Sequence, residues 1–263
     1  MGKICIVMAY YDRQYQLNKT LQSIEKSEHK DFSVIIVDDN SPQDIVVPAV
    51  PYEVEVIKLR KKSWTNCGPV YNIGFNKALE KNPDKIMIQS TECYHVGDVL
   101  SHADENVTDD NYIAYACFQV DKETTFKPHD IMELSNTNVK VTTDNHGAGQ
   151  NGWWNHSKYF VQPQYWGAVI KAKNLAKING IDERFAHGYA IEDGWFMDQV
   201  RRAGMRIDIV DYPFVVHQWH KRLYPKGTLE MVKQNTALWE SLLKTNEYKS
   251  LHHITPNLVW SGS

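Results

Sequence analysis

The sequence of 263 residues lacks long hydrophobic runs and a strong excess of charge of either sign. No apolar stretch approaches the roughly 18 residues that a membrane-spanning helix needs, so we expect no transmembrane segment. Lysine and arginine number 29 against 32 aspartates and glutamates, which gives a formal net charge of −3. This balance offers no electrostatic basis for a nucleic-acid partner. The 42% of hydrophobic residues excludes a disordered or fibrous chain.

Cysteine is also scarce. Cys5, Cys67, Cys93 and Cys117 are far apart and form no C-x-x-C pair, which argues against a zinc site or a disulfide framework. The apolar run within residues 1–10 is too short for a secretory signal and is more typical of a first strand. We therefore expect a cytoplasmic protein with reduced thiols.

Two common phosphate-binding motifs are missing as well. The first expected strand leads into Tyr10-Tyr11-Asp12-Arg13, and no dinucleotide fingerprint or Walker-type loop follows it. The same absence argues against a nucleotidyltransferase that makes sugar nucleotides, because such an enzyme should have a glycine-rich basic loop at this place.

What is present over the first 100 residues is an alternation of apolar runs and helical periodicity. Strands are expected at 3–9, 32–37, 54–59 and 85–89, and helices at 16–26 and 70–80. This order predicts an α/β fold with a mostly parallel central sheet flanked by helices. Such sheets bind ligands outside the carboxyl ends of their strands.

The second half is less regular. Residues 136–157 are rich in Asn, Thr, Gly and His and show no period, so we expect a functional loop that closes over a site. Beyond it the pattern predicts strands at 165–170, 206–210 and 214–216, and helices at 172–178, 192–204 and 228–243. Leu229 and Leu242 are candidate core residues of the last helix. No repeat or Pro/Gly linker divides the chain, which favours one domain.

Several acidic residues stand where such a fold places ligands. Asp38-Asp39 directly follow a buried strand, where carboxylates can accept from a ribose or a base, although the sequence also suits a plain turn. Glu92 follows the fourth strand and is either a ligand for a hard divalent cation or a surface glutamate. Glu192-Asp193 open a helix, where capping alone would explain one of them.

The acidic pair is also a candidate general base, whose pKa the helix dipole would lower. His217 and His220 follow a short strand with a spacing that allows either imidazole to bind a metal, although a lone histidine is more often structural. A histidine with a carboxylate suits a manganese-type site better than calcium.

Aromatic and basic clusters remain open to two interpretations. Trp153-Trp154 and Trp166 either stack on sugars or pack in the core, and the first pair is the stronger sugar candidate because it lies in the irregular segment. Arg60-Lys61-Lys62 meet either a diphosphate or solvent.

Taken in order, these motifs resemble the nucleotide-sugar glycosyltransferases of the A fold, most closely family 2, with a second half similar to the galactosyltransferase-type members. Val34–Ser41 matches the family's "I-I-V-V-D-D-G-S" segment and is the most specific likeness. The other matching segments are Ile6–Arg13 ("V-I-P-x-Y-N-R"), Asn66–Gly74 ("N-x-G-x-x-x-A-x-N-x-G"), Trp166–Ala168 ("G-G"), Ile181–Phe185 ("G-F-D-E-x-F") and Glu192-Asp193 followed by Arg201 or Arg202 ("E-D-x-D-L-x-x-R").

The resemblance implies a single A-fold domain over 1–225, with a nucleotide-binding half at about 1–100 and an acceptor half at 101–225. A C-terminal helix and tail, 226–263, would pack on it. It also implies the site residues: Asp38 at the uracil and Asp39 near the ribose, with Ala9, Tyr10, Tyr11, Arg13 and Asn72 around the donor; Trp153, Trp154, Trp166 and Gly167 at the acceptor; and Asp193, with Glu192 as the alternate, as the base.

One departure concerns the metal. The fold's Asp-x-Asp motif is replaced by Gln89-Ser90-Thr91-Glu92. We expect Glu92 with His217 or His220 to hold Mn²⁺ or Mg²⁺; the alternative is weakened metal dependence.

The implied activity is transfer of a hexose-type sugar from a nucleoside diphosphate sugar, with a UDP-sugar expected, to a hydroxyl of a glycan, lipid-linked or protein acceptor. Direct attack would invert the anomeric centre. The rival interpretation is a catalytically inactive nucleotide- or glycan-binding module of the same fold.

Overall fold

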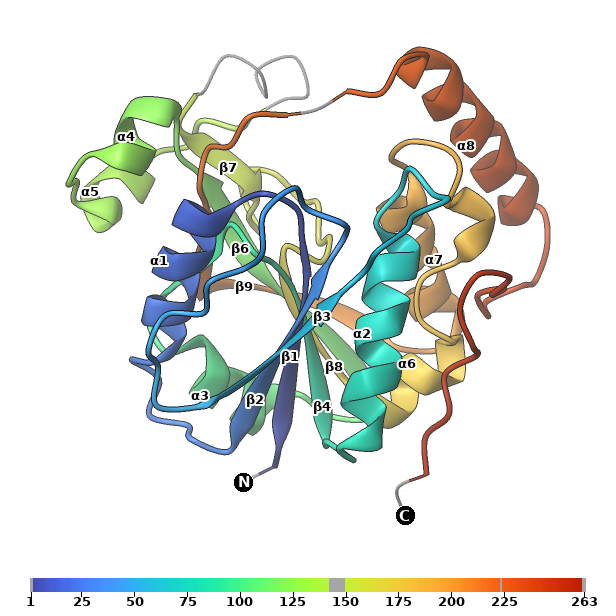
Figure 1. Cartoon of the computed structure of the whole chain (residues 1–263), viewed down its shortest axis with the longest axis horizontal. Coiled ribbons are helices and arrows are strands. Elements are labelled where there is room, and N and C mark those ends of the chain that lie inside the picture. Colours follow the sequence, from blue (N-terminus) through green and yellow to red (C-terminus); the bar gives the residue numbers. More distant parts are fainter. Residues whose placement is uncertain (1, 142–149, 223, 262–263) are drawn as a thin grey trace.

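The computed structural model describes residues 2–141, 150–222 and 224–261. Its strands form one mixed sheet with helices on both faces, which confirms the predicted α/β class (Figure 1). The strands are β1 Ile4–Tyr10, β2 Phe32–Asp38, β3 Glu53–Lys58, β4 Lys85–Ser90, β5 Cys93–Val96, β6 Asn111–Gln119, β7 Gly152–Asn155, β8 Gly167–Lys171 and β9 Arg206–His217. The helices are α1 Gln14–Ile24, α2 Gly68–Glu80, α3 Val99–Asn106, α4 Lys122–Phe126, α5 Ile131–Ser135, α6 Ala172–Ile178, the 3₁₀ turn η2 Glu183–Phe185, α7 Glu192–Arg202 and α8 Thr228–Leu243.

The sheet runs in the order β3-β2-β1-β4-β8-β6-β9-β5, and β7 pairs with β6. The first four positions are parallel, as the alternation of strands and helices predicts. β8 then pairs antiparallel with both β4 and β6, so the second half of the sheet is mixed. The carboxyl ends of β1, β2 and β4 therefore share one edge, where the site lies.

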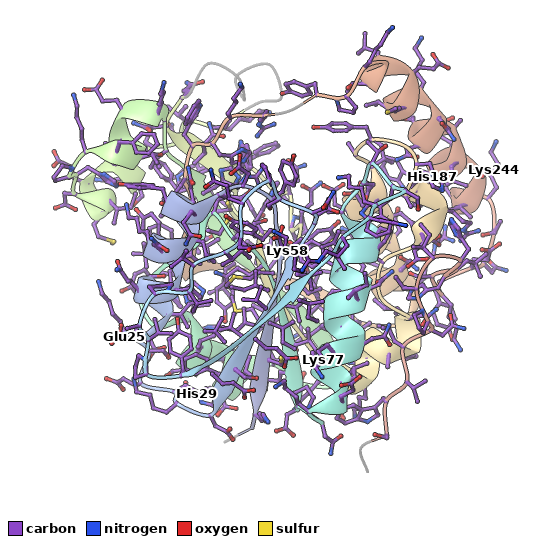
Figure 2. The ribbon with its side chains drawn as sticks, in the orientation of Figure 1. Glu25, His29, Lys58, Lys77, His187 and Lys244 are labelled. Atoms are coloured by element: carbon purple, nitrogen blue, oxygen red, sulfur yellow. The ribbon has the colours of Figure 1, made fainter. Side chains whose placement is uncertain are left out.

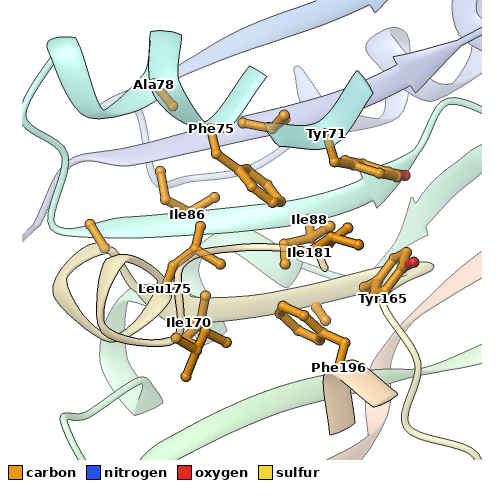
Figure 3. Close-up of a cluster of buried hydrophobic side chains, with 14 of the residues drawn as sticks. Tyr71, Phe75, Ala78, Ile86, Ile88, Tyr165, Ile170, Leu175, Ile181 and Phe196 are labelled. Atoms are coloured by element: carbon orange, nitrogen blue, oxygen red, sulfur yellow. The ribbon is translucent and has the colours of Figure 1, made fainter. Parts of the chain in front are cut away.

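The core occupies both faces of the sheet. On one face α2, α6 and α7 cover a cluster that includes Phe75, Ile88 and Phe196, all fully buried (Figures 1 and 3). On the other face α1 and α3 cover a second cluster that includes Leu17 and Ile36. The continuous apolar composition of β1 and β2 follows from this burial on both sides.

Three expectations for the second half are wrong. Trp153 and Trp154 do not lie in an irregular loop. They belong to the short strand β7 and are buried, because their rings complete the core beside β6 and β9. The two strands expected at 206–210 and 214–216 are one strand, β9, and Leu229 is 81% exposed on α8. Residues 142–149 of the expected loop lie outside the described residues.

The C-terminal part of the chain packs back on the domain. After β9, residues 218–222 and 224–227 lead across the top of the molecule to α8, and the tail then descends beside α2 (Figure 1). Asn235 and Leu242 are buried residues of α8, and Asn235 Nδ2 donates to the backbone oxygens of Phe185 and Ala190. α8 thereby holds the segment that leads into α7. Among the described residues, no helix is both long and apolar enough to cross a bilayer.

Candidate active site

The expected acidic residues gather at one sheet edge. Tyr10 pairs with Asp38 and Ala9 with Ser90, so the segments that follow β1, β2 and β4 begin side by side. A cavity of about 600 Å³ opens there. It is lined by Tyr11, Asp12, Arg13, Gln16, Asp39, Lys62, Trp64, Thr65, Tyr189, Trp219, His220, Lys221, Tyr224 and Pro225.

Asp39 is the carboxylate that faces this cavity. Lys62 Nζ lies 2.7 Å from its Oδ2, and the indole N–H of Trp64 donates to its Oδ1 at 3.1 Å. Burial raises the pKa of Asp39, and the two donors only partly offset that effect. The carboxylate is therefore held in a fixed orientation at the cavity wall.

Asp38 is fully buried behind it at the end of β2. Its Oδ1 accepts the backbone N–H of Ser41, and Lys58 Nζ lies 3.7 Å from Oδ2. Lys58 is labelled near the middle of the view in Figure 2. Within the described residues Oδ2 has no hydrogen-bond partner, so this buried oxygen keeps its capacity to accept one.

The residues at the end of β1 and just after it lie partly in the core and partly at the cavity. Tyr10 is only 4% exposed and packs against the α1 face, whereas Tyr11 lines the cavity. Ala9 packs on the opposite core cluster. Of the two tyrosines that the sequence offers for a nucleobase, the structure brings Tyr11 to the cavity.

Glu92 forms the centre of a buried cluster. Arg13 Nη1 lies 3.0 Å from Oε1 and 3.1 Å from Oε2, and Nε2 of both His217 and His220 lies 3.4 Å from Oε1. Thr91 donates its hydroxyl to Oε2. The local turn between β4 and β5 places Glu92 opposite the end of β9, because Cys93 pairs with His217.

The charge state of this cluster suits metal ligands. Burial would raise the pKa of Glu92, but Arg13 and the two histidines hold it well below its usual value. Burial lowers the pKa of His217 to about 4. At neutral pH the glutamate is thus ionised and His217 is neutral, the forms that bind a cation.

The donor set also fits a divalent metal by geometry. One ligand atom each from Glu92, His217 and His220 lie within 4.8 Å of one another. Two atoms about 2.1 Å from one metal are about 3.0–3.4 Å apart, close to the carboxylate–imidazole separations here. Two imidazoles and a carboxylate favour Mn²⁺ over Ca²⁺. The structure thus brings together all three residues that the sequence suggested.

Glu192 and Asp193 begin α7 as a second buried acidic group. The Tyr165 hydroxyl donates to Glu192 Oε1 at 3.3 Å, and Asp193 Oδ1 accepts the N–H of Gly194. Burial, followed by repulsion from Glu192, raises the pKa of Asp193 to about 7. The expectation that the helix dipole lowers this pKa is wrong, because desolvation outweighs the dipole. Neither carboxylate is among the described residues that line the 600 Å³ cavity.

The backbone that precedes this pair is strained. Ala190 and Ile191 have φ angles of 56° and 78°, and a β-branched residue rarely adopts the left-handed region. Such strain costs on the order of 1–3 kcal/mol for each residue and clusters at functional sites. Tyr189, one residue earlier, lines the cavity.

The expected acceptor residues are distributed between core and site. Trp154 adjoins the Glu92 cluster, with its ring 4.3 Å from that of His217, and Trp166 lies behind it, with the two indoles 5.1 Å apart. Trp153 instead packs on Phe118, and its N–H donates to a backbone oxygen. Gly167 begins β8, where a Cβ would lie 2.7 Å from Val215.

Asn72 does not line the cavity. Its Nδ2 donates to the backbone oxygen of Ile181 and to Glu183, and its Oδ1 accepts the N–H of Ile181. These bonds tie α2 to the segment before η2. The family-like asparagine thus lies in a structural junction behind the site.

Several residues that line the cavity were not predicted as site residues from the sequence. Lys62 was noted only within a basic run, and Trp64, Trp219 and Tyr224 were not singled out at all. A tryptophan two residues after a basic run is a weak signal. The segment that follows His217 carries aromatic and basic residues without any period that would point to a site.

The sequence was also compared with known protein families and with curated proteins. The model of the family described as Glycosyl transferase family 2 matches residues 5–171. It ends at 171, so the galactosyltransferase-type likeness of the second half stays a prediction. No curated protein matches the sequence.

Solved structures with a similar fold include S. aureus TarS 1-349 in complex with UDP, at 15% identity and a TM-score of 0.57, covering 89% of this chain and 64% of that chain. The same protein in complex with UDP-GlcNAc is 13% identical with a TM-score of 0.57, covering 89% and 66%. The mannosyltransferase PcManGT from Pyrobaculum calidifontis, in complex with GDP-Man and Mn²⁺, is 12% identical with a TM-score of 0.53, covering 93% and 65%.

This chain spans only 39% of a longer TarS structure, and at these identities the likeness concerns the fold. The family model, however, matches more than half of the sequence, and its span includes β1, β2, β4 and the acidic residues at their ends. The chain therefore belongs to glycosyltransferase family 2.

Proposed function

We propose that the protein transfers a sugar from a nucleoside diphosphate sugar to a hydroxyl acceptor. The observation that carries this proposal is the cavity at the strand ends, where a fixed Asp39 and the Glu92 cluster border one space. Similar folds in complex with UDP, UDP-GlcNAc and GDP-Man support a donor of this class.

The nucleoside would bind against β2. Asp39, oriented by Lys62 and Trp64, is suited to accept hydrogen bonds from the ribose hydroxyls. Asp38 Oδ2, which accepts no hydrogen bond from the described residues, is suited to accept a base N–H such as that of uracil, and Tyr11 offers a ring face. We favour a UDP-linked hexose, since the match at Val34–Ser41 points to that donor.

Glu92, His217 and His220 would hold the divalent cation, Mn²⁺ or Mg²⁺. When bound, such a cation neutralises the negative charge that develops on the leaving diphosphate. Lys62 and Lys221 add positive charge to the same cavity wall. Among the described residues, His217 Nδ1 has no hydrogen-bond partner, so this nitrogen is not committed to another group.

Asp193 would act as the general base, with Glu192 as the alternate. Its carboxylate takes the proton of the acceptor hydroxyl while the acceptor oxygen forms a bond to the anomeric carbon. The bond from that carbon to the diphosphate oxygen breaks, and its electron pair leaves with the diphosphate. A base with a pKa of about 7 is well matched to proton abstraction near neutral pH. Direct attack inverts the anomeric centre.

The acceptor would approach from the side of Trp154, Trp166 and Gly167, with Trp153 supporting the wall from behind. A glycan, a lipid-linked sugar or a protein side chain would each supply the hydroxyl. In this proposal residues 1–100 form the nucleotide half, 101–225 the acceptor half, and 226–263 a packed C-terminal element. We place the protein in the cytoplasm because its four dispersed cysteines are free thiols, as is usual in a reducing compartment.

Turnover tests the proposal. Purified protein is incubated with UDP-hexoses and Mn²⁺, and released UDP is measured with and without a panel of sugar acceptors. We expect UDP release that falls at least 100-fold in Glu92→Gln. UDP binding without any release, from every donor tested, would favour the inactive binding module instead.

A further inference from the structure

The salt bridge between Arg13 and Glu92 involves the carboxylate that the proposed cation would need. A single nitrogen, Arg13 Nη1, lies 3.0 Å from one oxygen of Glu92 and 3.1 Å from the other. Oε1 is also the oxygen that lies 3.4 Å from Nε2 of both histidines, so the guanidinium contacts the oxygen that a cation held by the three residues would use. The arginine thus neutralises the acid that the two histidines flank.

The local backbone directs this arginine to the glutamate. Asp12 adopts a left-handed φ of 50°, and its N–H donates to Ser41 Oγ at 3.0 Å. This turn joins β1 to α1 and places Arg13 at the start of the helix. Aspartate tolerates that conformation better than most residues, so the turn is inexpensive.

The guanidinium also has room to leave. Glu92 is 8% exposed whereas Arg13 is 24% exposed, and Arg13 lines the 600 Å³ cavity. Thr91 also donates to Oε2, and this bond does not involve the arginine. A guanidinium and a divalent cation on the same carboxylate repel each other, which makes their binding mutually exclusive.

We propose that Arg13 is a built-in competitor of the divalent cation: it holds Glu92 in the metal-free protein and must be displaced before the cation binds. The inference rests on the metal site proposed above. We therefore expect the wild-type chain to bind free Mn²⁺ weakly, because breaking the Arg13–Glu92 pair offsets part of the binding free energy.

The test measures Mn²⁺ affinity by the electron paramagnetic resonance signal of free Mn²⁺, with the full chain and no nucleotide. Arg13→Gln should bind Mn²⁺ at least tenfold more tightly than wild type. Adding Glu92→Gln to that variant should abolish the gain. The matched control is Arg206→Gln, which removes an exposed arginine that pairs with Asp208 and does not line the cavity, and should change the affinity less than twofold.

Equal or weaker Mn²⁺ binding by Arg13→Gln would overturn the inference and leave the metal site itself intact. Absence of Mn²⁺ binding in every variant, with saturating UDP present, would instead overturn the metal assignment of the proposed function. If Arg13→Gln does not fold, ¹⁵N NMR of the wild-type guanidinium during Mg²⁺ titration replaces it. Loss of its protection from solvent exchange supports displacement, and an unchanged signal contradicts it.

Discussion

At the scale of single residues, Asp193 carries the proposed proton transfer. Its side chain is half-buried beside Glu192 at the start of α7, and this environment raises its pKa to about 7. A carboxyl group with a pKa raised to near neutrality lowers the free energy of unfolding at neutral pH. We interpret it as a functional group, because stability alone gives no reason to retain two adjacent acids there.

Replacement of the proposed base should separate catalysis from binding. We expect Asp193→Asn to lower kcat about 10²–10⁴-fold, the usual contribution of a positioned base, while the Kd for UDP changes less than about twofold. Steady-state kinetics and calorimetry measure the two quantities. Asp198→Asn on the same helix is the control, because Asp198 serves to accept the indole N–H of Trp239. Near-normal turnover in Asp193→Asn would assign the base elsewhere.

The same residue makes stability depend on pH. In the unfolded chain an aspartate ionises near pH 3.9, whereas Asp193 in the fold does so at about 7. Stability therefore falls as the pH rises between these values and is constant above them. Asp193→Asn should gain on the order of 2 kcal/mol relative to wild type between pH 5 and pH 8. Urea denaturation at both pH values measures this, and a gain independent of pH would refute the raised pKa.

The sequence predicted those site residues whose position follows from a strand end. Asp38 ends β2, Asp39 follows it, and Glu92 lies two residues after β4, so their common edge follows from parallel pairing. The side chains that bond to each carboxylate could not be predicted from the strand positions. The bonds from Lys62 to Asp39 and from Arg13 to Glu92 join residues 23 and 79 positions apart and depend on side-chain packing.

At the scale of secondary-structure elements, two helical glycines differ in their surroundings. In α2, a Cβ on Gly74 would lie 2.4 Å from a methyl group of Val7 on β1. In α7, a Cβ on Gly194 would meet the ring of Trp239 at 3.6 Å, an ordinary contact. The first glycine permits close helix–sheet packing, and the second has no such need.

Alanine at these positions should therefore act in opposite directions. Gly74→Ala overpacks the interface and should cost about 1–3 kcal/mol. Gly194→Ala gains helix propensity and should stabilise by about 0.5–1 kcal/mol. Chemical denaturation of both variants measures the difference in sign. Stabilisation by Gly74→Ala would show that α2 does not approach β1 so closely.

Prediction of the elements succeeded where one signal was strong. The strands and helices up to β4 match their expected positions within two residues, because buried parallel strands are continuous apolar runs. β6, Asn111–Gln119, is buried along its whole length and was not among the expected strands. β9 was split at Pro213, which the sheet accommodates where the pairing of β6 and β9 shifts register.

At the scale of the whole molecule, the C-terminal tail is fastened to the domain by Glu183. This fully buried carboxylate accepts the backbone N–H groups of His253, Ile254 and Thr255, and the Thr255 hydroxyl. Although burial alone would raise the pKa of Glu183, these donors lower it. The bonds contribute stability above the unfolded pKa, which is lost as the pH falls through the folded value.

Removal of this carboxylate should release the tail. Glu183→Ala leaves several buried donors without partners and should lower the free energy of unfolding by about 3 kcal/mol or more. Limited proteolysis should then cut near residues 249–256 while the rest of the domain persists. Glu247→Gln, whose carboxylate pairs with Arg184 at the surface, is the control and should change the stability by less than about 1 kcal/mol.

The central claim is that the cavity beside Asp39 binds a nucleoside diphosphate. Thermal unfolding with UDP, GDP, CMP and ADP, each with and without Mn²⁺, tests it most directly. Ligand at about 100 times its Kd stabilises a fold by about 2.7 kcal/mol, or several degrees for a domain of this size. The account predicts the largest rise in Tm with UDP, increased further by Mn²⁺ and lost in Asp39→Ala. An unchanged Tm with all four nucleotides would contradict it.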